Sequence, residues 1–563
     1  MKLDIAREVQ KKMIEKGFKN LVFRSDYDYG EDSIDSRFLN AEELEALKQI
    51  CLQKKFHKDI VNRRVVRAVN MIQDLVKGGG EKKIANLQKM EGALIILLGP
   101  LPNHWVFKEE EVSKVMVPYF ISNIEYNPPT TRGGDYHPAY LKLEALAMRQ
   151  GTRASISKTI YSADITGGVT TAQFLGDIGW VPETPGLVEQ HTKHVDYYNE
   201  CSVKTGAQFL ARGQGKTFGE DHWDIETINF EKHGIPSKVV MDNKCEDNED
   251  SRGSYRGRNK NTPIIASVMW VKKEKKNKNQ EDEEESEPIR LPVHPFVDVF
   301  VLTAHQYATV HVANIQDYKY DEKLTEKLVL SDDKRELIDL LIHSEQDEYS
   351  DIVEGKGKGV IILTSGPPGT GKTLTAEVFA EKIKKPLYIV QCSQLGTDAT
   401  ALEKLLVKVL DRATRWGAIL LIDEADVYIH ERGDSMEQNA IVGVFLRLLE
   451  YYSGILFLTT NRVTIVDDAI ISRVMAHVRY KLPTADEKTK LWKILANQYG
   501  VNLPFEVIDE LVGDRMFEFL SGRSIKQLCR LSKALANKRK VEIDCELVEE
   551  VAEFQNIESV KDK

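Results

Sequence analysis

The chain has 563 residues, of which 42% are hydrophobic and 29% charged, and its formal net charge at pH 7 is −10. This length indicates about three to four domains, and the apolar content with 36 glycines and 18 prolines excludes wholly disordered and collagen-like classes. The negative net charge argues against a generally basic, phosphate-neutralising surface but leaves room for a local basic groove.

Cysteine usage and hydropathy point to a reducing compartment. Six cysteines are spread widely without a Cys-x-x-Cys pair, so neither a disulfide framework nor a zinc ribbon is expected. Residues 1–17 carry acids and lack an apolar stretch, which argues against a secretory signal. The longest apolar runs, 93–98 and 360–363, are too short to cross a bilayer. We therefore expect a cytoplasmic protein with no membrane segment.

Residues 1–125 are expected to form a mainly helical N-terminal region. Segments 41–52 and 57–77 place Ile, Leu and Val at intervals of three and four residues, with charges between them. This spacing is typical of amphipathic helices.

A β-rich domain is predicted over residues 126–322, where glycine and proline punctuate short apolar segments. A polar loop at 242–262 and a run of lysines and acids at 272–288 are expected to be disordered. A charge run of this kind is more often a solvated loop than an interaction tail. The strands are expected near 160–165, 174–181, 238–241, 264–271, 295–302 and 307–312.

The strongest motif begins after the apolar run 360–364, which is typical of a parallel strand buried on both faces. It continues into Gly366-Pro-Pro-Gly-Thr-Gly-Lys-Thr373 and then into a helical spacing from Leu374. Strand, glycine-rich loop, Lys-Thr and helix together form the context of a phosphate-binding loop. Backbone N–H groups of the loop and the positive helix end would face the phosphates. We expect Lys372 to reach the β- and γ-phosphates and the Thr373 hydroxyl to bind Mg²⁺.

A second Gly-Lys-Thr string, at 213–217, does not fit the same pattern. Leu210, not glycine, stands five residues before Gly215, so the required spacing fails. We expect no nucleotide site there.

Acids follow a second apolar strand about fifty residues after the loop, in Ile419-Leu-Leu-Ile-Asp-Glu-Ala-Asp426. Ligands of parallel sheets bind at the carboxyl ends of strands. We expect Asp423 to hold Mg²⁺ through water, and Glu424 to orient and deprotonate an attacking water.

Two further polar residues follow in chain order. Asn461 ends the apolar segment 454–461 and is a candidate for holding water against the γ-phosphate, the alternative being a turn cap. Arg473 ends the short segment 467–473. A lone arginine is usually a surface residue, but in this order we expect it to reach the nucleotide of a neighbouring subunit.

Together these residues resemble the AAA+ ATPases over about residues 325–563. The matching motifs are Walker A at 366–373, Walker B at 420–424 with Asp426 extending it, sensor 1 at Asn461 and an arginine-finger position at Arg473. Arg523, in Ser521-Gly-Arg-Ser524, stands where many AAA+ proteins place a sensor 2 arginine.

The resemblance implies an α/β fold: a P-loop NTPase parallel-sheet core at 323–485 and a C-terminal helical lid at 486–563, preceded by a mixed α+β N-terminal region. It implies ATP and Mg²⁺ as ligands, with Lys372, Glu424, Asn461 and Arg473 as catalytic residues and Thr373 and Asp423 at the metal. The expected nucleotide contacts are Gly366, Pro367, Pro368, Gly369, Thr370, Gly371, Lys372, Thr373, Leu374 and Arg523.

Several strings, including DIVEGKGKG and LLIDEADVYIHER, are similar to fungal and bacterial AAA-domain proteins with a long N-terminal region of unknown role. A more distant likeness is to the mitochondrial AAA assembly factor for the Rieske protein, whose membrane helix this chain lacks.

The expected function is an ATP-hydrolysing machine that works as a homo-oligomeric ring, with a hexamer expected. It would remodel a protein partner recognised through residues 1–320. One departure from the family favours an alternative, a nucleotide-gated scaffold with slow hydrolysis. In segment 386–398, Tyr388 lies inside the predicted strand and the short loop offers only Leu395 and Gly396, so the aromatic grip of threading enzymes is missing.

A third reading, a nucleic-acid remodeller, depends on the string at 252–258 alone, where arginines surround a tyrosine. His191, His194 and His222 have no metal-protease spacing and are expected to be helix-surface residues.

Overall fold

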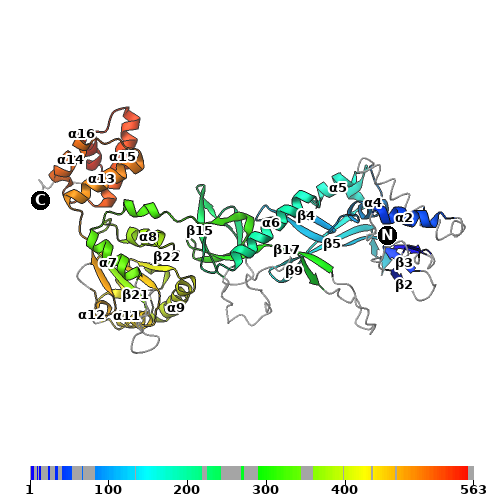
Figure 1. Cartoon of the computed structure of the whole chain (residues 1–563), viewed down its shortest axis with the longest axis horizontal. Helices are drawn as coiled ribbons and strands as arrows, with labels where there is room; N and C mark the ends of the chain where they lie inside the picture. The colour runs from blue at the N-terminus through cyan, green and yellow to red at the C-terminus, as the bar shows by residue number, and fades with distance from the viewer. Residues whose placement is uncertain are drawn as a thin grey trace.

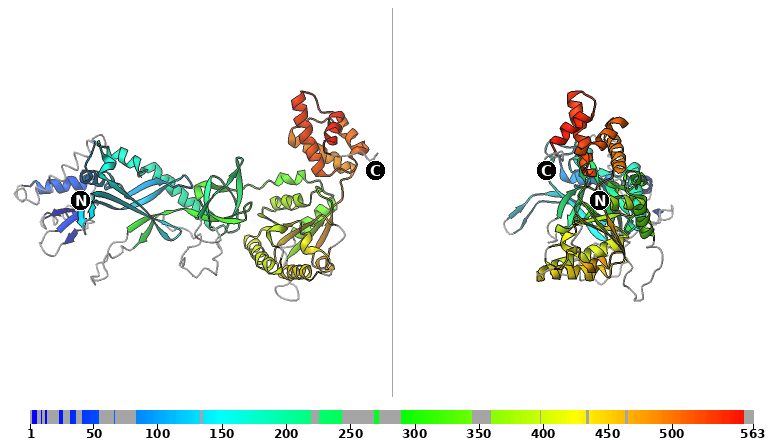
Figure 2. Two further views of the ribbon diagram at one scale, coloured as in Figure 1. Left: turned by 180° about the vertical axis from the view of Figure 1, so that it is seen from behind. Right: turned by 90° about the vertical axis from the view of Figure 1, so that its left-hand side faces the viewer.

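A computed structural model describes residues 2–5, 9, 12–13, 23–25, 32–35, 41–53, 66, 83–132, 135–218, 225–242, 268–271, 289–343, 359–396, 398–432, 435–462 and 466–555. The molecule is elongated, with the N-terminal elements at one end and the C-terminal helices at the other (Figure 1). The view from behind shows the same order of domains along the long axis (Figure 2).

The first described elements form a small sheet and a helix. Strands β1 (Lys2–Ile5), β3 (Asp32–Asp35) and β2 (Phe23–Ser25) pair antiparallel in that order. Helix α2 (Ala41–Cys51) occupies the first of the two predicted helical segments. The second predicted helix, 57–77, lies outside the described residues except for Val66.

A seven-stranded sheet follows, built around long antiparallel strands. Helix α4 (Leu87–Leu98) covers it with an almost wholly apolar surface that includes Leu87, Met90 and Leu94. The strand order is β10 (Val181–Pro182), β4 (Trp105–Glu109), β5 (Met116–Asn127), β8 (Tyr140–Arg149), β17 (Ile289–His294) and β16 (Val268–Val271), and β9 (Thr152–Tyr161) also pairs with β8. Strands β6 (Thr130–Arg132) and β7 (Asp135–His137) form a separate two-stranded sheet.

Two details differ from the sequence-based expectation. The expected boundary at residue 125 falls inside β5, whose pairing with β8 runs through Asn127. The expected strand at 174–181 is largely helix α5 (Thr171–Asp177). A reciprocal capping box between Thr170 and Gln173 starts this helix by satisfying backbone N–H groups at its N-terminus. The expected strand near 160–165 ends at Tyr161, and a 3₁₀ turn covers Ser162–Ile165.

The second large sheet is antiparallel and has eight strands. Helix α6 (Pro185–Ser202) precedes it, and Tyr198 and Cys201 of this helix join its apolar core. The chain crosses between the two sheets at Pro295, which separates β17 from β18. The order is β13 (Ile225–Asn229), β12 (Gln214–Phe218), β19 (Gln306–His311), β18 (Phe296–Val301), β15 (Ile235–Met241), β11 (Gln208–Ala211) and β20 (Ile315–Asp317), with β14 (Glu231–Lys232) beside β15.

The third sheet is entirely parallel, in the order β22 (Leu387–Gln391), β23 (Ile419–Asp423), β24 (Ile455–Thr460), β21 (Val360–Ser365) and β25 (Ala476–Arg479). Its strands are apolar on both faces because helices cover both. Alternate residues of β21, such as Ile361 and Ile362, therefore belong to different core clusters. Helices α9 (Ala399–Trp416) and α11 (Met436–Leu449) cover one face, and α7 (Asp332–His343) and α8 (Lys372–Lys382) cover the other. The short helices α10 (Asp426–Ile429) and α12 (Asp468–Ile471) follow β23 and β24.

Four helices form a separate C-terminal domain beside the parallel sheet (Figure 1). They are α13 (Ala485–Tyr499), α14 (Phe505–Gly513), α15 (Gly522–Arg539) and α16 (Cys545–Glu553). Trp492, Phe517 and Ile525 are fully buried at their centre. Among the helices that the structure describes, none combines the length and apolar content required to span a bilayer.

The parallel sheet depends on Phe457, a fully buried side chain in β24. Phe457→Ala is expected to lower the free energy of unfolding by about 3–5 kcal/mol, because it removes apolar contacts and leaves a cavity. Met436→Ala is the control, since this side chain is 87% exposed and its loss should change stability by no more than about 0.5 kcal/mol. Urea denaturation followed by circular dichroism compares the two variants, and equal midpoints would contradict the expectation.

Candidate functional site

The glycine-rich loop lies between β21 and α8 and adopts a backbone that requires glycine. Gly366 and Gly369 have φ of +147° and +77°. A Cβ at Gly366 would collide with the carbonyl of Tyr480, and one at Gly369 would lie 2.7 Å from the Cβ of Arg523. The loop is therefore packed closely between β25's end and the C-terminal helical domain, with its course fixed on both sides.

Lys372 begins α8 and its side chain turns back over the loop. Its Nζ donates hydrogen bonds to the carbonyls of Gly366 (2.7 Å) and Pro367 (2.8 Å). Burial lowers the pKa of this ammonium, the Asp423 carboxylate opposes that change, and the Arg523 guanidinium adds to it. A buried cation beside a loop of positive-φ glycines and a helix N-terminus suits an anionic phosphate ligand.

Asp423 collects two hydroxyl donors at the carboxyl end of β23. Thr373 Oγ1 on α8 and Thr459 Oγ1 on β24 donate to the same oxygen, Asp423 Oδ1, at 3.1 Å and 2.5 Å. A carboxylate and a hydroxyl oxygen side by side are the hard oxygen donors that Mg²⁺ prefers. The residues therefore fit a magnesium ion between α8 and β23.

Glu424 follows Asp423 in a backbone conformation that is uncommon for a non-glycine residue, with φ of +55°. Thr459 Oγ1 accepts a hydrogen bond from the Glu424 amide (2.9 Å), which ties this turn to β24. The Glu424 side chain is exposed at the mouth of the site. The turn thus places an accessible carboxylate next to the Thr373–Asp423 pair.

Thr459 is a site residue that the sequence reasoning missed. Its role follows from the register, in which Ile422 of β23 lies opposite Leu458 of β24, so the next residues, Asp423 and Thr459, are also neighbours. The threonine before Asn461 in the third apolar segment was the available signal. His477, whose Nε2 lies 2.8 Å from Ser365 Oγ at the start of the loop, was also missed.

The structure places Asn461 directly after β24, with its side chain exposed. The neighbouring Thr460 hydroxyl donates to the Asp426 carboxylate and accepts from the Arg462 amide. Asp426 is thereby held by β24, while Asn461 stays accessible at the same edge of the sheet as Asp423.

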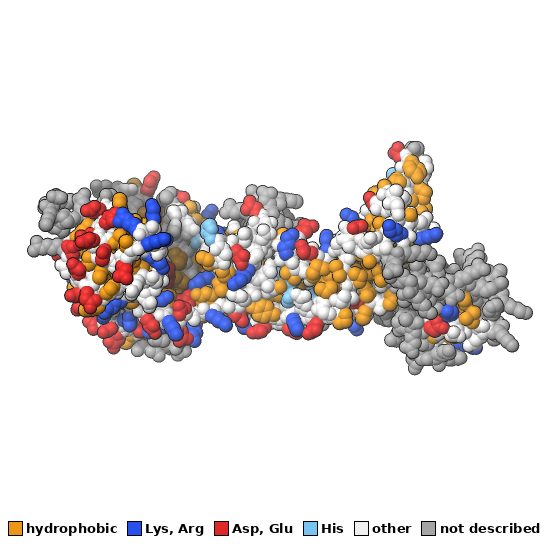
Figure 3. Space-filling model, turned by 90° about the horizontal axis from the view of Figure 1, so that it is seen from above, with side chains coloured by type: hydrophobic (Ala, Val, Ile, Leu, Met, Phe, Trp, Pro, Cys, Tyr) orange, Lys and Arg blue, Asp and Glu red, His pale blue; other side chains and the backbone are white. Residues whose placement is uncertain are grey.

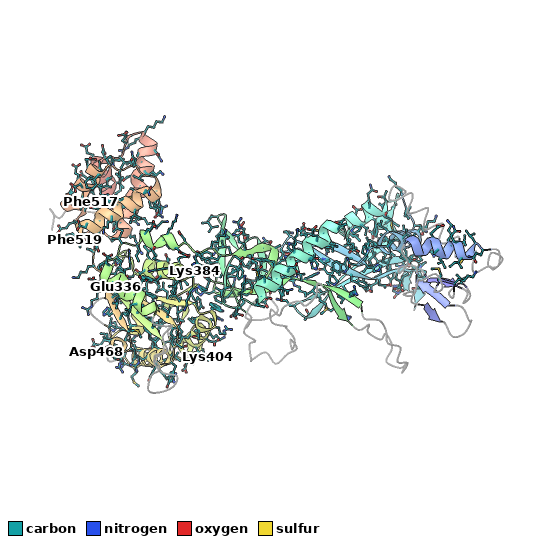
Figure 4. All side chains as sticks on the ribbon, in the orientation of Figure 1. Glu336, Lys384, Lys404, Asp468, Phe517 and Phe519 are labelled. Atoms are coloured by element: carbon teal, nitrogen blue, oxygen red, sulfur yellow. The ribbon has the colours of Figure 1, made fainter. Side chains whose placement is uncertain are left out.

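Arg473 lies after α12 on the exposed surface. Its Nη1 donates to the Ala469 carbonyl (3.0 Å), and its Nη2 lies 3.8 Å from Glu450. Asp468, labelled in Figure 4, marks the start of α12 at the outer edge of this domain. The hydrogen bonds and ion pairs of Arg473 within the described chain do not include the loop at 366–371. Of the other arginines weighed from the sequence, Arg432 pairs with Asp467 and Arg447 with Glu403.

The C-terminal helical domain meets the loop through the start of α15. The Arg523 amide donates to the Gly369 carbonyl (3.3 Å), and the Ser521 hydroxyl accepts from the Ser524 amide and caps the helix. The N-termini of α8 and α15 therefore both adjoin the glycine-rich loop. Phe517 and Phe519, labelled in Figure 4, precede α15 on this domain.

Other residues singled out from the sequence lie elsewhere. Tyr388 is buried within β22, as expected, and Leu395 is also buried, so neither offers an exposed grip. The second Gly-Lys-Thr string lies on β12, where Lys216 pairs with Glu110 at 3.4 Å. His191 is buried on α6, not on the helix surface as expected, because its ring packs against Trp105. His222 and the arginine string at 252–258 lie outside the described residues.

Within the described residues, no cluster of three or more His, Cys, Asp and Glu side chains could hold a metal ion. The Thr373–Asp423 pair is not such a cluster, because one of its two members is a threonine. On the face shown in Figure 3, Lys and Arg side chains are interspersed with Asp and Glu rather than gathered in one basic stripe.

Comparison with known proteins identifies the C-terminal half. Residues 362–482 match the ATPase family associated with various cellular activities (AAA). A putative 26S proteasome regulatory subunit homolog of Methanothermobacter thermautotrophicus is 29% identical over 180 residues, which cover 29% of this chain and 46% of the relative. A katanin p60 ATPase-containing protein of the A-like 1 type from Sorex araneus is 30% identical over 200 residues, covering 33% of this chain and 40% of the relative.

A chain of the solved E. coli MS115-1 HORMA:CdnC:Trip13 complex is 18% identical and aligns with a TM-score of 0.34, covering 41% of this chain and 90% of that one. The present chain spans less than half of the length of both relatives above. The matched family and the parallel sheet with its helical C-terminal domain confirm the predicted α/β P-loop NTPase fold. The chain belongs to the AAA+ superfamily.

Proposed function

We propose that this protein is a magnesium-dependent ATPase that couples ATP binding and hydrolysis to the remodelling of a protein partner. The single observation that carries the proposal is the convergence of Thr373 and Thr459 on one oxygen of Asp423, directly beside the loop held by Lys372. Membership of the AAA+ superfamily supports nucleotide binding at this place.

The chain's own groups account for binding of the triphosphate. Backbone N–H groups of residues 366–371 and the N-terminus of α8 supply a positive cradle. Lys372 would exchange its two carbonyl acceptors for phosphate oxygens, and Arg523 would add a second cation from the helical domain. Thr373 and Asp423 would hold Mg²⁺, which when bound neutralises charge on the β- and γ-phosphate oxygens.

Glu424 would act as the general base. Its carboxylate is exposed at the site, while the hydrogen bond from its amide to Thr459 fixes the turn that presents it. Asn461, at the end of the adjacent strand, would hold the attacking water in line through its amide group.

Arg473 supports a site shared between subunits. It is an exposed cation whose contacts within the chain are confined to its own helix and Glu450. An arginine supplied by a neighbouring subunit can stabilise the charge that develops in phosphoryl transfer. We therefore propose a homo-oligomeric ring, with a hexamer expected, in which residues 1–320 recognise the protein partner.

A second candidate is a nucleotide-gated scaffold in which slow hydrolysis only resets the assembly. The burial of both Tyr388 and Leu395 favours it, because the expected substrate-gripping segment then offers no exposed aromatic side chain. A large increase in ATP turnover on adding an unfolded protein would support the remodelling machine, whereas ATP-dependent assembly with negligible turnover would support the scaffold. The nucleic-acid alternative has no described residue behind it.

Glu424→Gln is expected to leave ATP bound and to lower turnover by about 10²–10⁴-fold, because the amide cannot accept the proton of water. Phosphate release and equilibrium ATP binding, measured on the same samples, separate the two effects. Glu431→Gln is the matched control, since this exposed carboxylate follows β23 by only a few residues and should leave turnover intact. Wild-type turnover in Glu424→Gln would refute the assigned role.

Arg473→Ala is expected to lower turnover by about 10³–10⁵-fold while ATP still binds. If the site is shared, mixing Arg473→Ala with Glu424→Gln subunits should restore part of the activity, because some seams regain both groups. Arg447→Ala, which removes another exposed arginine, serves as the control. A strictly monomeric protein with undiminished turnover after losing Arg473 would exclude the shared site.

A further inference from the structure

Strand β15 of the second sheet faces two different cores. Val239 and Met241 pack inside the β-rich domain, whereas Val240 belongs to the core of the parallel-sheet domain. Side chains alternate along a strand, so Lys238 and Asp242 point to the same side as Val240. One edge of the β-rich domain is therefore built into the ATPase core.

Lys238 contacts Glu381, a buried carboxylate in the last turn of α8. Glu381 Oε1 accepts from Lys238 Nζ (3.0 Å) and from the Tyr318 hydroxyl (2.5 Å), and its Oε2 accepts from the Asp321 amide (2.9 Å). Burial alone would raise the pKa of this carboxyl, but the hydrogen bonds from Tyr318, Asp321 and Lys238 outweigh it and hold the pKa below its ordinary value.

The position of Glu381 is unfavourable unless these donors are present. A negative charge near the C-terminus of a helix opposes the helix dipole, and a buried carboxylate costs free energy unless it is paired. All three donors come from the β-rich domain and the segment that follows it. The end of α8 is therefore stabilised by a contact with another domain.

A second buried carboxylate, Asp242, makes an equivalent contact behind the other half of the site. It accepts from Arg415 at the end of α9, with Nη2 at 3.1 Å, and from the Tyr307 hydroxyl at 2.7 Å. Residues 417–418 then lead from α9 directly into β23, which carries Asp423. The residues behind both halves of the nucleotide site are thus attached to β15.

Apolar packing closes the same junction. The ring of Phe300 lies 5.0 Å from that of Trp416 and 5.6 Å from that of Tyr388. Gly206 approaches the Trp416 backbone so closely that a Cβ would lie 2.6 Å from its carbonyl oxygen. Lys384, labelled in Figure 4, follows α8 on the side of the ATPase core that faces the β-rich domain.

We propose that Glu381 is a positioning residue that couples the β-rich domain to the nucleotide site through α8. Glu381 lies nine residues after Lys372, so about 13 Å of continuous helix joins the phosphate-binding end to the domain contact. Nucleotide binding at the first end changes the load on α8, and β15 responds because it holds the second end. This inference rests on the proposed ATPase function.

Hydrogen exchange on the full chain tests the coupling, with and without a non-hydrolysable ATP analogue and Mg²⁺. In the wild type, the analogue is expected to slow exchange in the loop at 366–373 and also in β15. Glu381→Ala should keep the slowing at the loop and lose it at β15. Its KM for ATP should rise by about fivefold or more, with a smaller change in kcat. Tyr318→Phe, a milder variant that removes only one donor, should reduce the effect at β15.

Glu322→Gln is the matched control, because Glu322 pairs with Lys384 at 2.8 Å on the exposed surface of the same junction. It should behave as the wild type in both measurements. Slowing at the loop without any slowing at β15 in the wild type would overturn the coupling, and so would β15 protection that survives in both Glu381→Ala and Tyr318→Phe. No slowing anywhere would overturn the proposed nucleotide site, and the coupling with it.

Discussion

The nucleotide site depends on one oxygen atom, Asp423 Oδ1, which accepts hydrogen bonds from two hydroxyls on different elements. Thr373 brings α8 to it, and Thr459 brings β24, while Thr459 also receives the amide of Glu424. A carboxylate that satisfies several donors fixes their relative positions, because each donor left unpaired in a buried site would cost about 1–3 kcal/mol. The phosphate-binding helix, the acidic strand and the neighbouring strand are therefore held in register by a single side chain.

Much of this arrangement could be predicted from the sequence because it is local. Strand, loop and helix follow one another within 360–382, and a continuous apolar run followed by acids suffices to mark β23. Thr459 was missed because its role depends on which strands are neighbours. That order, with β24 between β23 and β21, is a property of the whole sheet and not of any one segment.

The N-terminal half was harder to predict for the same physical reason. Its sheets join strands that are far apart in the chain, such as β8 and β17, so a domain boundary cannot be read from local composition. The helix at 171–177 shows that a short apolar stretch between glycines does not by itself specify a strand. The capping pair Thr170 and Gln173 was the local signal that distinguishes the two.

The contact between Lys238 and Glu381 joins residues 143 positions apart, beyond the reach of any sequence pattern. It has an energetic consequence for the whole protein. Two buried carboxylates, Glu381 and Asp242, keep their partners only while the β-rich domain stays docked. Undocking would leave charged groups without several of their donors at once, which makes partial separation costly. A domain attached in this way does not move as an independent tethered module. Whatever binds to residues 1–320 therefore acts on an element that is continuous with the ATPase core.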